Sequence, residues 1–244
     1  MVLTEPQGEG SIESNQVMES AHCPEELELL KLLKELQSIM AAALNSLANK
    51  KPNTAESRYI SDAAISVNMA ADAYLLLREQ ERVHASKLLI RPMVDIVISA
   101  TAVTKKKGFL FRKAYTELQE MKRTYDKTPA NDASAKTYLE RLKRKFQEEP
   151  GYPIECQAVD ARYTAQVADL LPVYEKAYRI YCEFTHSSTR AIRGSLNQAT
   201  DPIDTSMVIW SVVFMLEHLR VLLELPGDFS LDGLRGPERR QRSL

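Results

Sequence analysis

Residues 24–47 read Pro-Glu-Glu-Leu-Glu-Leu-Leu-Lys-Leu-Leu-Lys-Glu-Leu-Gln-Ser-Ile-Met-Ala-Ala-Ala-Leu-Asn-Ser-Leu, and their apolar side chains recur every three or four positions. Pro24 suits the first turn of a helix, and the acidic Glu25 and Glu26 favour its positive end. The stretch therefore predicts an amphipathic helix over about 24–49. Its apolar positions are Leu29, Leu32, Leu33, Leu36, Met40, Ala43, Leu44 and Leu47.

Composition extends this prediction to the whole chain. The 244 residues are 44% hydrophobic and 27% charged, which is ordinary for a soluble globular protein. Glycine occurs only eight times, and no alternating Val/Ile/Thr run is bounded by Asn-Gly or Asp-Gly turns. We therefore expect an all-α fold.

Local signals divide the rest of the chain into further helices. A capping box at Asn53 and Glu56 predicts a second helix to about Arg78, and Pro92 predicts a kink or a restart near Ile90 in a third helix. The remaining expected segments are 82–104 for that third helix, then 109–127, 131–149, 160–170, 172–185 (or one helix broken at Pro172), 189–196 and 204–225. We expect one bundle of about seven to eight helices over 23–225, an acidic disordered tail over 1–22 and a flexible tail over 226–244.

Cysteine and histidine usage excludes several classes of site. Cys23, Cys156 and Cys182 are odd in number and form no Cys-x-x-Cys pair, and His84 and His218 lack ligand-type neighbours. We expect no metal and no cofactor. No signal peptide is visible, and the longest apolar run is far shorter than the roughly 20 residues that span a bilayer. A cytoplasmic protein without membrane contact is the expectation.

Charge is distributed unevenly, although the net charge is only −1. Residues 105–145 hold thirteen Lys/Arg against five Asp/Glu, whereas residues 1–35 hold eight glutamates against two lysines. A basic excess of this size can attract RNA, a nucleotide or an acidic partner. Lysine-rich solvated helix faces give the same pattern, so both interpretations stay open.

Residues 178–188, Tyr-Arg-Ile-Tyr-Cys-Glu-Phe-Thr-His-Ser-Ser, contain the candidate functional site. On a helix, Arg179, Glu183 and His186 fall on one face, because they are four and three residues apart. Such a set can perform acid–base chemistry on a phosphate, or it can attach one helix to its neighbour.

Two segments together resemble the bacterial family known as domain of unknown function 5677. His84-Ala-Ser-Lys-Leu-Leu-Ile-Arg-Pro-Met-Val-Asp95 resembles its Ala-x-x-Leu-x-Arg-x-x-x-Glu helix, with Arg91 and Asp95 at the charged positions. The stretch from Tyr178 to Ser188 resembles its Tyr-x-x-x-Ser-x-x-x-His-x-Ser signature, with Cys182 in place of serine. The resemblance covers about residues 40–200 and implies an all-helical cytoplasmic protein without an assigned activity.

A looser similarity is to HEPN-type helical domains, whose ribonuclease members carry Arg-x(4 to 6)-His on a helix. Arg179 and His186 are separated by six residues, at the limit of that spacing, and Ile180 replaces the polar residue that usually follows the arginine. This similarity implies a metal-independent ribonuclease of defence or toxin type, with Arg179 and His186 catalytic.

Two hypotheses about function follow. In the first, Arg91 and Asp95 pair with Arg179 and Glu183 as a charged cluster between two helices, in a structural or ligand-binding module that self-associates through an apolar helix face. In the second, Arg179 and His186 cleave RNA that the basic 105–145 segment holds. The expected binding residues are Arg91, Asp95, Tyr178, Glu183 and Ser187.

Overall fold

The computed structural model describes residues 24–50, 52, 54–126, 158–178, 180–182 and 202–224, together with single positions between 137 and 148. This part of the chain is helical and contains no strand, which confirms the predicted all-α class. The helices are α1 (Pro24–Lys50), α2 (Ala55–Glu79), α3 (Val83–Lys87), α4 (Ile90–Lys105), α5 (Phe109–Asp126), α7 (Ala161–Val167), α8 (Leu171–Val173), the π-helical turn η1 (Tyr174–Tyr178) and α11 (Pro202–Leu222).

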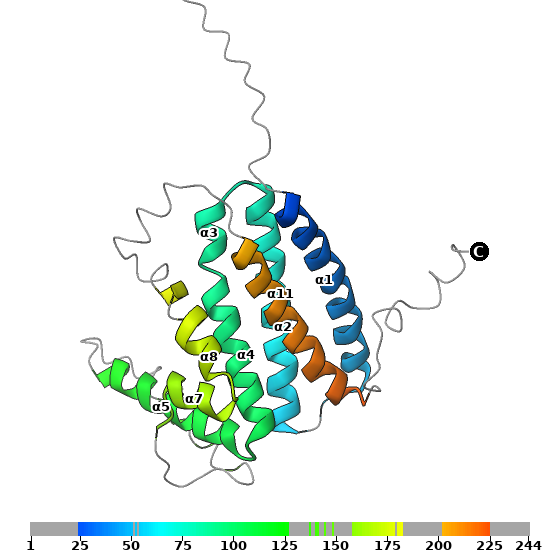
Figure 1. Ribbon diagram of the computed structural model, residues 1–244. Coiled ribbons are helices and arrows are strands. Elements are labelled where there is room, and N and C mark those ends of the chain that lie inside the picture. The colour runs from blue at the N-terminus through cyan, green and yellow to red at the C-terminus, as the bar shows by residue number, and fades with distance from the viewer. Residues whose placement is uncertain are drawn as a thin grey trace, which may run out of the picture.

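Four long helices, α1, α2, α4 and α11, pack together and enclose the core (Figure 1). The first and last helices of the described chain, α1 and α11, lie side by side, and α2 and α4 pack against α11 as well. Small buried residues on α2, namely Ala63, Ala64 and Ala71, allow neighbouring helices to approach closely. Helix α5 and the short α7 and α8 lie at one side of these four helices.

The start of α2 differs by one residue from the prediction. The N-cap is Thr54, not Asn53, and the reciprocal partner is Ser57, not Glu56. The Ser57 amide donates to Thr54 Oγ1 at 3.0 Å, and Ser57 Oγ accepts from the Thr54 amide at 3.1 Å. The prediction of a capping box is confirmed, but the hydroxyl side chains of Thr54 and Ser57 form it in place of the Asn53 amide and the Glu56 carboxylate.

Pro92 causes a restart of the helix. α3 ends at Lys87, and α4 begins at Ile90, so Pro92 is the third residue of a new helix. The amides of a first turn have no intrahelical acceptor, and a proline there loses no hydrogen bond. This outcome confirms the restart near Ile90.

A second proline, Pro172, occupies the first turn of α8. The preceding helix α7 has already ended, and Asp169 adopts a positive φ of 58° in the connection. Two helices are therefore present, with the break before Pro172. The predicted helix 189–196 and both tails lie outside the described residues, as does most of 131–149.

Helices α2 and α11 are each long and apolar enough, by length and composition alone, to cross a bilayer. Both also pack against other helices of the bundle, and the core helices of globular proteins pass the same test. The predicted absence of a membrane span, the cytoplasmic location and the self-association therefore stay predictions.

Candidate functional site: a buried charged cluster and a basic corner

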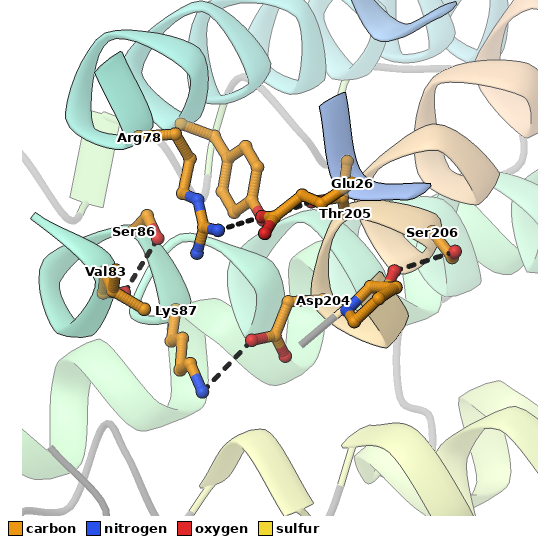
Figure 2. A network of polar contacts seen from close by, with 10 residues as sticks. Glu26, Arg78, Val83, Ser86, Lys87, Asp204, Thr205 and Ser206 are labelled. Carbon is orange, nitrogen blue, oxygen red and sulfur yellow. Dashed lines mark hydrogen bonds and ion pairs between the residues drawn. The ribbon is translucent and has the colours of Figure 1, made fainter. Parts of the chain in front are cut away.

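The first charged site lies where α1 and α2 meet. Arg78 of α2 donates through Nη2 to Oε1 of Glu26 in the first turn of α1, and both side chains are fully buried (Figure 2). Moving two charges out of water costs several kcal/mol each, and their mutual attraction offsets this cost only with good geometry and further partners. Whether this pair stabilises the fold therefore depends on the other polar groups around it.

Neutral side chains from α2 and α11 surround this ion pair. Tyr74 Oη lies 2.9 Å from Thr205 Oγ1, and Thr205 Oγ1 lies 3.4 Å from Glu26 Oε1. The guanidinium carbon of Arg78 is 5.9 Å from the centre of the Tyr74 ring, within cation–π range. Burial lowers the pKa of Arg78 from its usual value, and the neighbouring Asp204 carboxylate opposes the shift.

A second ion pair lies beside the first. The Lys87 ammonium is 3.1 Å from Oδ2 of Asp204, with side-chain exposures of 15% and 6%. Tyr181 Oη donates to Oδ1 of the same carboxylate at 2.7 Å. Figure 2 shows Lys87 facing Asp204 close to the Arg78–Glu26 pair. We call Glu26, Arg78, Lys87 and Asp204 the charged cluster; its two cations and two carboxylates sum to zero.

The charged cluster joins elements that are far apart in sequence. Its members come from α1, α2, α3 and α11, and Tyr181 adds the short helical stretch 180–182. That stretch belongs to the signature segment 178–188. The Tyr181–Asp204 hydrogen bond therefore attaches the beginning of the signature segment to the first turn of α11.

The predicted site residues on α4 are half-buried. Asp95 lies near Tyr59 of α2, whose hydroxyl is hydrogen-bonded to the Ser99 side chain. Burial raises the pKa of Tyr59 to about 12; Glu117 and Asp95 add to the shift and Ser99 opposes it. Arg91 makes a contact of its own and is not an isolated charge.

The other predicted site residues lie outside the described part of the chain. These are Arg179, Glu183, His186, Ser187 and the side chain of Tyr178, whose backbone ends η1. The predicted pairing of the α4 residues with Arg179 and Glu183 therefore stays a prediction. The described residues contain a different charged cluster, which sequence reasoning missed.

One sequence signal points to Arg78. It continues the series Ile60, Ala64, Val67, Ala71 and Tyr74, all of which are buried, so an arginine stands at a core position of an apolar helix. Glu26 gave no such signal, because an acid in a first turn is favourable even when it is exposed.

The second charged site lies beside the turn between α4 and α5, where Lys106 is exposed and Arg112 and Tyr163 are half-buried. Lys106 Nζ donates to Tyr163 Oη of α7 at 2.9 Å, and Arg112 Nη1 donates to the same oxygen at 3.5 Å. The Lys106 hydrogen bond is the largest cause that lowers the pKa of Tyr163, and the charges of Lys106 and Arg112 act in the same direction. We call Lys105, Lys106, Lys107, Arg112 and Tyr163 the basic corner.

Comparison with known proteins identifies a family and assigns no activity. The model of a family of unknown function, DUF5677, matches residues 58–203, more than half of the chain, and the match includes both segments on which the resemblance was based. No curated protein and no solved structure matches. The HEPN similarity stays a prediction. With the match spanning α2 to the first residues of α11, the chain belongs to the DUF5677 family.

Proposed function

We propose that the chain is a helical module that binds an anionic, phosphate-bearing ligand such as RNA at its basic corner, and that the charged cluster is a structural clamp. The observation that carries this proposal is the different pairing of cations at the two sites. In the charged cluster each cation has a buried carboxylate beside it. Among the described residues, by contrast, Lys106, Lys107 and Arg112 form no ion pair.

The neighbours of the basic corner strengthen this contrast. Lys105 pairs with Asp169 at 2.7 Å, and Lys113 pairs with Glu117 at 3.3 Å, so these two carboxylates are already engaged with other lysines. Two exposed lysines on the turn, together with the half-buried Arg112 of α5, create a positive potential that attracts polyanions. A closed and electrically neutral core cluster has no such tendency.

RNA binding tests the proposal. Fluorescence anisotropy with a labelled single-stranded RNA is expected to show binding that weakens steadily as salt rises, because phosphate contacts release counterions. The double variant Lys106→Gln/Lys107→Gln should weaken binding several-fold. The matched control is Lys31→Gln/Lys34→Gln, which removes two exposed lysines from α1. Absence of binding at low salt, or an equal loss in both variants, contradicts the proposal.

A sharper form of this function is a metal-independent ribonuclease that uses Arg179 and His186. It is favoured by one observation: α7, which carries Tyr163, and η1, which leads into the signature segment, both pack against α4. The basic corner lies at the C-terminal end of α4, whereas Tyr181 lies with Asp204 and Lys87 near its N-terminal end. A histidine can act as a general acid or base, and an arginine can stabilise the charge of a phosphorane-like transition state.

An RNA-cleavage assay distinguishes a ribonuclease from a protein that only binds RNA. For the ribonuclease, a labelled RNA should be cut in the presence of a chelator, and His186→Ala should abolish cutting while RNA binding and thermal stability change little. His84→Ala is the matched control and should retain activity. If the RNA stays intact after long incubation with folded wild-type protein, the ribonuclease proposal is wrong and the binding proposal stands.

A further inference from the structure

We propose that Lys106, Arg112 and Tyr163 form a recognition site for a single phosphate group, held by an ammonium, a guanidinium and a phenol hydroxyl. The proposal rests on the proposed function, since it names the contact by which the basic corner holds its phosphate-bearing ligand. The same chemistry fits a phosphate of an RNA chain and a free phosphate or mononucleotide, and the experiment below distinguishes them.

Three separate elements bring the donors together. Lys106 follows α4, Arg112 lies in α5, and Tyr163 lies in α7. Tyr163 is held at its backbone, because its amide donates to Oδ1 of the N-cap Asp160 at 2.6 Å. Its ring also lies 6.3 Å from that of the buried Phe109. A phenol fixed in this way gives the two flexible cations a common point of attachment.

The hydrogen-bond pattern leaves donors available. Tyr163 Oη accepts from both Lys106 and Arg112, so its own O–H hydrogen is directed elsewhere and can be donated. An ammonium has three N–H groups and a guanidinium has five, and each uses one here; Arg112 Nε is buried, so the guanidinium offers its remaining terminal N–H groups. Three kinds of donor therefore converge near one point, and a phosphate offers several acceptor oxygens to them.

Electrostatics favour an anion at this point. The same two cations lower the pKa of Tyr163, which makes its hydroxyl a better donor than an ordinary phenol. Both cations also lie close to the Tyr163 ring, with Lys106 Nζ 5.4 Å and the Arg112 guanidinium carbon 5.7 Å from its centre. These contacts preorganise the cations without neutralising them.

The turn beside these residues is open. Gly108 has a φ of 74°, and a Cβ atom placed on it would meet no other atom within 4 Å. A positive φ is the reason for glycine here. Lys106, two residues before this glycine, is itself exposed at the turn.

Three variants test the site in the full-length protein, each measured by anisotropy with RNA at several salt concentrations. Lys106→Gln/Arg112→Gln should weaken binding about tenfold or more and reduce the slope of log K against log salt by about 0.7, since one neutralised phosphate is lost. Tyr163→Phe should weaken binding several-fold and leave the slope unchanged, because it removes a donor and no charge. Lys31→Gln should change neither value.

Competition identifies the source of the phosphate. Inorganic phosphate and a nucleoside monophosphate are titrated against the labelled RNA. If low millimolar phosphate or monophosphate displaces RNA from wild type but not from Tyr163→Phe, the site binds a terminal or free phosphate. Displacement only by RNA assigns it to the polymer backbone. If wild type binds RNA and the Lys106→Gln/Arg112→Gln and Tyr163→Phe variants bind equally well, this site is wrong and the proposed function stands. If wild type binds neither RNA nor phosphate, both are wrong.

Discussion

The charged cluster and the basic corner use similar side chains in opposite surroundings. Each contains an arginine and a lysine and has a tyrosine hydroxyl in contact with one of its charged groups. In the cluster, Arg78 and Lys87 are paired with Glu26 and Asp204 inside the bundle. At the corner, Lys106 and Arg112 share only a phenol oxygen at the surface.

The difference teaches what each group of charges can do. A buried cation must keep its carboxylate, because an unpaired charge in the core costs several kcal/mol, so the cluster is tied to stability. An exposed cation is hydrated, and its contacts contribute little to folding. Under the proposed function, similar side chains stabilise the fold in the cluster and bind a ligand at the corner.

Removal of Arg78 is expected to have the largest effect. Arg78→Leu leaves Glu26 buried without its cation, and the free energy of unfolding should fall by about 3–5 kcal/mol. Urea unfolding followed by circular dichroism measures it. The double variant Glu26→Leu/Arg78→Leu is the control and should recover most of the loss, since no unpaired charge remains. A loss below about 1 kcal/mol in Arg78→Leu would mean that the pair is not a clamp.

The sequence predicted the helices much better than the cluster. The periodicity of residues 24–47 and the position of Pro92 are local signals, and the ends of α1 and the restart of α4 follow them within one residue. The cluster depends on contacts between distant residues: 52 positions separate Glu26 from Arg78 (78 − 26), and 117 separate Lys87 from Asp204 (204 − 87). No local pattern encodes which distant acid meets a buried arginine. The same limit applies to Lys106, Arg112 and Tyr163, where composition indicated a basic segment but not the phenol between the cations.

Tyrosine hydroxyls in the cluster should show a smaller effect. Tyr181→Phe removes a hydrogen bond to the charged Asp204 and should cost about 1.5–3 kcal/mol. Tyr74→Phe is the matched comparison, because its hydroxyl meets the neutral Thr205 and should cost about 0.5–1.5 kcal/mol. Equal costs would show that the charge of Asp204 is not the reason for the contact. Faster hydrogen exchange of the 178–182 backbone in Tyr181→Phe, but not in Tyr74→Phe, would confirm that the Tyr181 hydroxyl attaches the signature segment.

A titratable group outside both regions gives a pH-dependent effect. His218 of α11 is half-buried, with Nε2 3.0 Å from Thr101 Oγ1, and burial lowers its pKa. Its stabilising contribution is complete above the unfolded pKa of about 6.5 and decreases as pH falls through that value toward the folded pKa. His218→Gln should therefore flatten this part of the stability profile between pH 7 and 5. A profile identical to wild type would mean that the histidine is solvated.

The smallest effect on stability is expected at the basic corner. Lys106→Gln/Arg112→Gln removes an exposed contact and a long, part-buried contact to Tyr163, so the free energy of unfolding should change by no more than about 0.5 kcal/mol. Loss of two neighbouring positive charges also relieves repulsion with Lys105 and Lys107, which can offset the missing hydrogen bonds. Urea unfolding of this variant beside Arg78→Leu is the direct comparison. If this variant loses several kcal/mol of unfolding free energy, the cations of the corner stabilise the fold as those of the cluster do. That result would contradict the proposal of a binding surface.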